Sequence, residues 1–392
     1  MSNETWLLPE GIEEVLPPRA AFLEAKRRAI LDLYHSWGYE MVIPPLIEYL
    51  ESLLTGTGDD LDLQTFKLTD QLNGRMMGVR ADMTPQVARI DAHQLRRKTP
   101  TRLCYMGTVL HTRPQGFDAS RAPLQIGLEL YGHSGVESDV EVFQLMVATL
   151  ETCDVNDVYF DLGHVGVYRG LVKQAGLNAQ QEAALFDALQ RKAKPEIQDM
   201  LSALKIDATV RDMLLALADL NGDDSVLLKM EKVLAKASAE VKQAISELKN
   251  IAAAIARRLP KVSLHYDLAE LRGYHYHTGV VFAAFASGKG SAIAQGGRYD
   301  GIGEVFGNTR PATGFSTDLK TLLAFNREQV VQQPGIFAPN NDDELLQQAI
   351  AESRAAGERV IVELPGQTGD AKAMACDRQF VKEKKQWLIK PI

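Results

Sequence analysis

The sequence predicts an α+β fold: an antiparallel sheet flanked by helices, with a helical insertion and a small C-terminal α/β appendage. Strand-like runs stand on both sides of a stretch, about residues 178–259, that is rich in Ala, Leu, Lys, Glu and Gln. The apolar residues of that stretch recur at helical spacing. After residues 332–335, a linker pattern, strand and helix patterns alternate again. We therefore expect one domain over residues 1–325, with the insertion inside it, and a second over residues 334–392.

The helices and strands of the N-terminal part are predicted from apolar spacing and from glycine and proline positions. Leu23, Ile30 and Leu33 have helical spacing, and Gly38 ends that pattern. Pro85 suits the first turn of a further helix. Helices are expected at 18–37, from about residue 85, and at 136–152, and strands at 39–43, 65–68, 76–80, 102–110 and 124–132.

The same patterns predict the helices and strands of the C-terminal part. Strands resume at 262–264, 280–285 and 292–294 after the insertion. In the appendage, strands are expected at 336–338, 359–364 and 387–389, and helices at 343–355 and 371–385. About 60 residues is near the lower limit for a domain that folds alone.

Composition excludes several classes of protein. The net charge of −8 argues weakly against a dedicated nucleic-acid binder. Three distant cysteines without a CxxC motif fit reduced thiols, and no apolar run reaches 18 residues. We expect a cytoplasmic protein with no membrane span, no metal and no dinucleotide cofactor.

Two segments place polar side chains where a free amino acid could bind. Asp82 and Thr84 precede Pro85, and a carboxylate beside a hydroxyl suits an ammonium group. Gln125 and Glu129 alternate with apolar residues, so both side chains lie on one face of a strand. Each segment also has a plain structural interpretation, a helix cap for the first and a half-solvated strand for the second.

The most specific motifs are RGYHYHTG at 272–279 and GGRYDG at 296–301. Both follow apolar strand-like runs, so their Arg and Tyr side chains can converge on a pocket, while glycine lets backbone approach a ligand. A metal site at His275 and His277 is disfavoured because no third ligand stands at a suitable spacing.

These segments together resemble the catalytic domain of class II histidyl-tRNA synthetases over residues 8 to about 325. Two departures matter. The motif 2 arginine of that family falls on His111, with Arg113 and Arg121 nearby, and the motif 3 arginine falls on Thr321. Neither residue replaces a guanidinium that grips phosphate. The tail is also shorter than an anticodon-binding domain.

A pocket that persists while ATP-handling residues are lost resembles the regulatory subunit of short-form ATP phosphoribosyltransferase. The resemblance implies a non-catalytic protein that activates the short catalytic subunit and carries feedback inhibition by histidine in the first step of histidine biosynthesis. It also implies a homodimer within a hetero-octamer that binds no tRNA. The implied histidine contacts are Asp82, Thr84, Gln125, Glu129, Arg272, Tyr276, His277 and Tyr299. The alternatives are an active histidyl-tRNA synthetase and a synthetase-like enzyme with another substrate.

Overall fold

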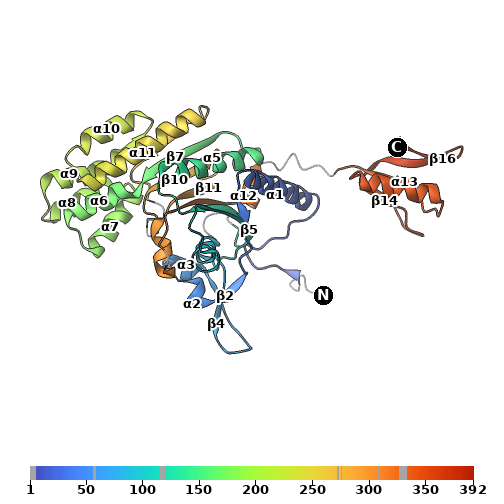
Figure 1. The fold of residues 1–392 in the computed structure, drawn as a ribbon, viewed down its shortest axis with the longest axis horizontal. Helices are drawn as coiled ribbons and strands as arrows, with labels where there is room; N and C mark the ends of the chain where they lie inside the picture. The colour runs from blue at the N-terminus through green and yellow to red at the C-terminus, as the bar shows by residue number, and fades with distance from the viewer. Residues whose placement is uncertain are drawn as a thin grey trace. The chain divides into compact units, whose positions relative to one another are not determined.

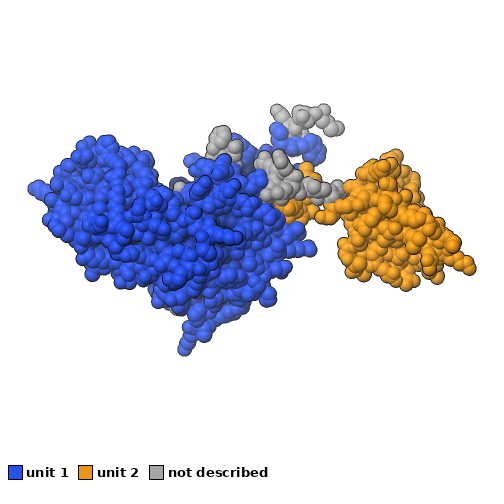
Figure 2. All heavy atoms as spheres, turned by 90° about the horizontal axis from the view of Figure 1, so that it is seen from above, with its two compact units in different colours: residues 1–14, 23–327 blue, residues 15–22, 328–392 orange. Residues whose placement is uncertain are grey.

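The computed structural model describes residues 6–55, 59–114, 120–271, 273–274, 276–307, 309–325 and 333–392. The chain forms two compact units, residues 1–14 with 23–327 and residues 15–22 with 328–392 (Figure 2). Within the described residues, no helix is both long and apolar enough to cross a membrane.

The larger unit is built on a sheet in which nine strands are described. In spatial order they are β1 (Glu40–Met41), β5 (Thr101–Thr108), β6 (Leu124–Tyr131), β12 (Ala312–Asp318), β11 (Ala294–Arg298), β10 (Val280–Ala286), β7 (Val158–His164), β9 (Leu264–Asp267) and β8 (Asn221–Gly222). The pairs β1–β5 and β7–β9 are parallel and the others are antiparallel. The central strands are thus antiparallel, as expected, while two pairs near the edges make the sheet mixed.

Helices cover one face of this sheet, and the other face carries the site (Figure 1). On the covered face, Phe315 of β12 makes an edge contact with Tyr34 of α1 (Arg19–Ser36). Phe282 of β10 packs in the same way on Phe143 of α5 (Val136–Thr152). Because side chains alternate along a strand, the neighbours of Phe315 and Phe282 point to the opposite face, which we call the open face. The short helices α4 (Thr84–Arg89), η2 (Ile90–Leu95) and η4 (Asp300–Phe306) pack over the β5 part of it.

The stretch between β7 and β9 is mainly helical. Its elements are α6 (Val165–Ala175), α7 (Ala179–Gln190), α8 (Lys194–Ala203), α9 (Ala208–Ala216), η3 (Leu217–Asp219), α10 (Ser225–Val233) and α11 (Ala239–Arg258), with β8 before α10. These helices lie together on the left of Figure 1, with α6 and α11 in contact with β10 and β7 of the sheet. The long α11 buries Val241, Ile245 and Leu248, the residues that share one helical face in the sequence.

Shorter elements complete the larger unit. A three-stranded antiparallel sheet has the order β2 (Ile47–Tyr49), β4 (Met76–Val79), β3 (Phe66–Thr69). The short helices are α2 (Leu50–Leu53), α3 (Asp59–Gln64), α4 (Thr84–Arg89), the π-helix η2 (Ile90–Leu95), the 3-10 helix η4 (Asp300–Phe306) and α12 (Leu319–Leu323). The segments α4 with η2 and η4 matter most, because both lead away from the site.

The smaller unit has one helix, α13 (Glu344–Ala355), on a four-stranded sheet in its described part. The strands are β14 (Val360–Val362), β13 (Gly335–Ala338), β15 (Cys376–Glu383) and β16 (Gln386–Pro391), in that spatial order. The helix predicted at 371–385 is wrong: β15 occupies that segment and forms a hairpin with β16. Lys384 takes a left-handed φ of 54° in the tight turn between β15 and β16. The run of charged residues around it gave no sign of a turn in the sequence.

Candidate functional site

The site is centred on Glu129, which lies in the middle of the open face of the sheet. Glu129 pairs with Leu103 of β5 on one side and Gly314 of β12 on the other, and Gly314 in turn pairs with Gly297 of β11. Because the two glycines have no side chains, the neighbouring strands leave space beside Glu129, and its carboxyl group packs directly over Gly314. Only 1% of the surface of Glu129 is exposed, which is unusual for an ionisable side chain that has no cationic partner among the described residues.

Two tyrosine hydroxyls hold the Glu129 carboxyl group. Tyr105 of β5 donates to Oε1 at 2.9 Å, and Tyr299 donates to Oε2. The hydroxyl groups of Tyr105 and Thr84 are 3.1 Å apart and share a further hydrogen bond. Burial raises the pKa of Glu129 to about 8, although these hydrogen bonds act in the opposite direction. With this pKa, the Glu129 carboxyl group is mostly protonated at neutral pH.

A second polar pair lies beside this cluster. Gln125 donates from Nε2 to Oδ1 of Asp82 at 2.7 Å, and its own Oε1 accepts from the Met83 backbone N–H at 2.9 Å. The Thr84 N–H also donates to Oδ1 of Asp82 at 2.9 Å. In the described part of the chain, Oδ2 of Asp82 has no hydrogen-bond partner, which leaves it able to accept from a ligand. The N-cap residue of α4 is Met83, and Asp82 accepts from the first N–H of the helix, as the capping interpretation expects; that interpretation does not account for the further bond from Gln125 to Asp82.

The RGYHYHTG segment brings two more side chains to the cluster. The His277 ring is buried and makes an edge contact with the Tyr299 ring at 6.5 Å, and it lies 4.3 Å from the Tyr276 ring. Tyr276 exposes 47% of its surface, yet burial of its hydroxyl, followed by the charges of Asp82 and Glu129, raises its pKa. Tyr276 thus lies, partly exposed, at the edge of the cluster beside His277.

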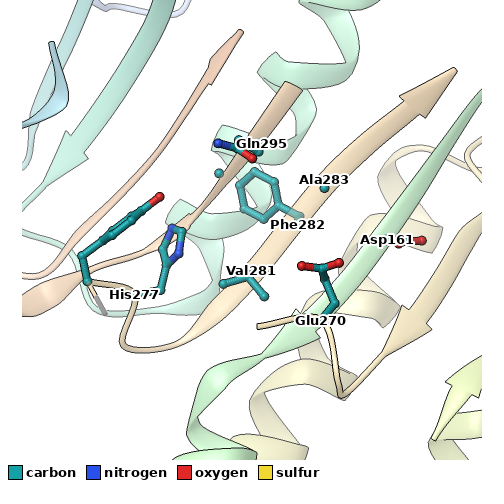
Figure 3. A pocket seen from close by; sticks show the side chains of 9 residues that line it. Asp161, Glu270, His277, Val281, Phe282, Ala283 and Gln295 are labelled. Atoms are coloured by element: carbon teal, nitrogen blue, oxygen red, sulfur yellow. The ribbon is translucent and has the colours of Figure 1, made fainter. Parts of the chain in front are cut away.

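The open face continues past His277 into a pocket that Gln295 also borders (Figure 3). Asp161 and Glu270 lie on its other side. Of the predicted site residues, Arg272 lies outside the described residues, as does His275 of the same motif. Within the described chain, no group of three or more His, Cys, Asp or Glu side chains could hold a metal ion.

The structure brings together the described residues that the sequence singled out. They are Asp82, Thr84, Gln125, Glu129, Tyr276, His277 and Tyr299. The expectation that the arginine of GGRYDG faces the pocket is wrong, because Arg298 points to the covered face and binds Asp139 at 2.9 Å. Sequence reasoning also missed Tyr105. Its only signal was its place in a predicted strand, and the β5–β6 register is needed to set it beside Glu129.

The two positions where the related synthetases have ATP-binding arginines are occupied differently. His111 is buried, and its Nε2 is 2.9 Å from the Ala81 carbonyl oxygen, to which it donates. The nearby Arg121 is bound to backbone, through Nε to the His111 carbonyl at 3.0 Å and through Nη1 to the Glu10 carbonyl at 3.0 Å. Thr321 donates its hydroxyl to Oδ2 of Asp318 at 2.7 Å. None of these groups presents a free guanidinium to the open face; Arg113, which is exposed, has no partner in the described chain.

Comparisons with known proteins agree with this geometry. A family model described as Histidyl-tRNA synthetase matches residues 11–322, and one described as ATP phosphoribosyltransferase subunit HisZ C-terminal domain matches residues 333–390. Two relatives carry the name ATP phosphoribosyltransferase regulatory subunit. The one from Thioalkalivibrio sulfidiphilus is 62% identical over 389 residues, covering 99% of this chain and 98% of the relative. The one from Alkalilimnicola ehrlichii is 57% identical over 393 residues, covering 100% and 98%.

Solved structures show the same fold. An ATP phosphoribosyltransferase regulatory subunit/histidyl-tRNA synthetase from Bacillus halodurans has a TM-score of 0.82 at 25% identity, covering 94% of this chain and 95% of that one. A histidyl-tRNA synthetase from Nostoc has a TM-score of 0.77 at 20% identity, covering 96% and 91%, and this likeness concerns the fold alone. The predicted class II synthetase-like α+β fold is confirmed.

Proposed function

The chain belongs to the ATP phosphoribosyltransferase regulatory subunits, and from this premise we propose that it senses free histidine in the Glu129 pocket. It is a non-catalytic subunit that acts with the catalytic subunit of ATP phosphoribosyltransferase. The observation that carries the proposal is the buried Glu129 carboxyl group, held by Tyr105 and Tyr299. Such a group costs stability, because a buried carboxyl without a charged partner is poorly solvated. Ionisable groups buried at such a loss of stability are concentrated at functional sites, so we expect Glu129 to contact a ligand.

The pocket supplies a complement to each polar part of histidine. Asp82 offers Oδ2 to the α-ammonium group, with Thr84 and Gln125 beside it. Glu129 and Tyr299 lie deeper and can accept from or donate to the imidazole ring, because a carboxyl group and a hydroxyl can each do both. Tyr276 and His277 would cover the bound ligand. Arg272 is proposed to bind the carboxylate, since an arginine at that motif position is suited to a bidentate pair.

The altered ATP positions support regulation rather than catalysis. A synthetase stabilises the charge that develops on the α-phosphate with preorganised cations. Here His111 is committed to the Ala81 carbonyl and Thr321 to Asp318. An amino acid can therefore bind without being activated, which is what feedback sensing requires. We propose that histidine acts through its different affinity for two states of the complex, because only such a difference shifts an equilibrium.

The assembly is also part of the proposal. We infer a homodimer of this chain within a hetero-octamer with the catalytic subunit, in the cytoplasm and without tRNA. The exposed apolar residues near β1 support the homodimer: Trp37, Met41, Ile43, Leu46 and Ile47. Several exposed large apolar residues within eleven positions of the chain favour an interface there, since larger exposed apolar surface often marks one.

Calorimetry with free histidine and no ATP tests the proposal. The Glu129→Gln change keeps the size of the side chain and removes its ability to become charged, so histidine should bind more weakly by about 1.5–3 kcal/mol. Asp82→Asn should do the same through the ammonium group. Glu151→Gln is the matched control, because the Glu151 side chain is exposed and has no partner in the described chain.

Two further measurements complete this test. Histidine at 100 times its dissociation constant should raise the stability of the unmodified protein by about 2.7 kcal/mol. The concentration of histidine that half-inhibits the complex should rise in the two pocket variants by the factor seen in calorimetry. Equal histidine affinity in the unmodified protein, Glu129→Gln and Asp82→Asn would refute the pocket as the sensor.

A further inference from the structure

A second groove in the larger unit is lined by cationic side chains. Its volume is about 690 Å³, within the range of roughly 300–1,000 Å³ for small-ligand sites. Its polar lining consists of His93, Arg96, Arg97, Lys98 and Arg310. The whole chain has a net charge of −8, so this concentration of positive charge is opposite in sign to the rest of the protein. A concave surface of this kind concentrates anions.

The backbone explains why three consecutive basic residues line one groove. The π-helix η2 ends at Leu95, and Arg96 takes a left-handed φ of 48°. In a continuing helix, successive side chains would be turned by about 100° from one another and could not share the groove. The left-handed turn ends the helix, and the segment 96–98 then lies along the groove. A residue with a Cβ rarely adopts this conformation, and such residues are common at functional sites.

The charges of the groove divide into two kinds. Arg310 is bound to Asp91 at 2.9 and 3.0 Å and donates to the Thr99 carbonyl, and Arg97 is paired with Glu40. These ion pairs hold Arg310 and Arg97 in place at the sides of the groove. Arg96 and Lys98 are exposed, and among the residues the structure describes their side chains have neither an ion-pair nor a hydrogen-bond partner. Two unneutralised cations thus face the same space.

We propose that this groove binds a small ligand of the diphosphate or triphosphate class, and that its occupancy is coupled to the Glu129 pocket. The Arg96 guanidinium offers a planar fork that matches phosphate oxygens, and the Lys98 ammonium offers a point charge next to it. Two adjacent phosphate groups present enough negative charge to engage both. A single carboxylate would leave one of the two cations unpaired.

The coupling follows from the two segments that connect the groove with the pocket. The segment α4–η2 begins at Thr84 in the pocket and ends beside Arg96 in the groove. The segment η4 begins directly after Tyr299, which holds Glu129, and ends at Phe306 beside the groove. The two segments pack against each other, with Val87 and Ala92 of the first and Tyr299 and Phe306 at the two ends of the second in one hydrophobic core. A ligand that shifts them at one end changes the geometry at the other.

Titration of the full chain with inorganic pyrophosphate at constant ionic strength tests the groove. The variant Arg96→Asn with Lys98→Gln removes both free charges, and asparagine tolerates the left-handed backbone. Its affinity for pyrophosphate should be at least about tenfold weaker, because charge-assisted bonds are lost. The control is Lys232→Gln with Arg257→Gln, an equal charge change at exposed residues of α10 and α11 without partners in the described chain. The control should bind pyrophosphate as the unmodified protein does.

Several outcomes would overturn the groove site: no binding by the unmodified protein, undiminished binding by the groove variant, or equal losses in both variants. ATP as a second probe separates the sources of the phosphate, since a nucleotide site should bind ATP at least as tightly as pyrophosphate and a free diphosphate site should not. If pyrophosphate does not bind but a short RNA duplex does, and if this RNA binding requires Arg96 and Lys98, the groove is a nucleic-acid site instead.

The coupling is tested by titrating histidine with and without saturating pyrophosphate. This arm rests on the proposed histidine site. The histidine affinity should change by about threefold or more, and pyrophosphate affinity should change by the same factor in saturating histidine, because linkage is reciprocal. Unchanged histidine affinity would refute the coupling. If histidine does not bind at all, the pyrophosphate titration still decides the groove, so the two proposals fail separately.

Discussion

Gly314 lies directly opposite Glu129 in the antiparallel β6–β12 pair, and a Cβ atom at position 314 would overlap Oε2 of Glu129. The carboxyl group therefore occupies the space that any other residue at 314 would fill. The Gly314 backbone is not in the left-handed region, so the requirement for glycine comes from close approach: to the Glu129 carboxyl group and to the Leu128 carbonyl oxygen, which a Cβ at 314 would meet at 2.6 Å.

The first prediction follows from that contact. Gly314→Ala should displace the Glu129 side chain, lower the free energy of unfolding by about 1–3 kcal/mol as overpacking does, and weaken histidine binding at least about tenfold. Thermal unfolding and calorimetry measure the two effects. Gly290→Ala is the matched control, because a Cβ at 290 meets no atom within 4 Å. Normal histidine binding by Gly314→Ala would show that the carboxyl position is unimportant for the ligand.

The Gly314 contact also shows the limit of sequence reasoning here. Alternation along β6 placed Gln125 and Glu129 on one face, because side-chain direction in a strand is a local property. Which residues of β5, β11 and β12 lie beside them depends on register between strands distant in sequence. The role of Tyr105 and the direction of Arg298 could therefore not be read from spacing, and family motifs supplied the rest of the cluster.

The same distinction explains the outcome in the smaller unit. The helix expected at 343–355 is confirmed as α13, and the structure shows that Asp343 caps it. The alternation of strand and helix patterns also predicted a helix at 371–385, where the structure has the strand β15 (Cys376–Glu383). Pairing of β15 with both β13 and β16 determines its structure, and the strand contributes buried Phe380 to the core of the smaller unit. Tertiary pairing outweighed the local pattern.

The second prediction concerns amino-acid activation. Because Thr321 and His111 occupy the arginine positions, histidine-dependent pyrophosphate exchange should be at background. Loss of one such donor lowers the rate by about 10²–10³, and here both are replaced. A bona fide histidyl-tRNA synthetase assayed in parallel supplies the reference rate. Exchange within tenfold of that reference would contradict the non-catalytic assignment of the pocket.

The third prediction concerns self-association. Ile43 is 79% exposed and lies with Met41 and Ile47 on the apolar surface near β1. Light scattering should give twice the chain mass of 43.2 kDa at micromolar concentration, since interfaces of this kind usually bury more than about 2,000 Å². Ile43→Asp should shift the equilibrium toward monomer. Leu228→Asp, at a 63% exposed residue of α10, should leave the dimer intact, and a stable monomer of the unmodified chain would refute the interface.

The fourth prediction is the pH dependence of stability that Glu129 imposes. Burial raises the pKa of its carboxyl group in the folded chain to about 8, against an ordinary value of 4.5. Below pH 4.5 the group is protonated in the folded and the unfolded chain, so it adds no pH dependence. Between pH 4.5 and 8 the unfolded chain loses this proton and the folded chain keeps it. The free energy of unfolding must therefore fall as pH rises through this window, and become level above it.

Chemical denaturation of the unmodified protein and Glu129→Gln, across this range of pH and without histidine, isolates the effect. Other titrating groups are common to both proteins, so the difference between their unfolding free energies reports Glu129 alone. That difference should move against the unmodified protein by a few kcal/mol, at about 1.4 kcal/mol for each pKa unit. Gln is a fair substitute for the protonated acid, because Tyr105 and Tyr299 can each accept as well as donate a hydrogen bond. Parallel curves for the two proteins would mean that Glu129 is ionised in the folded chain at neutral pH, and that the pocket holds a carboxylate before histidine arrives.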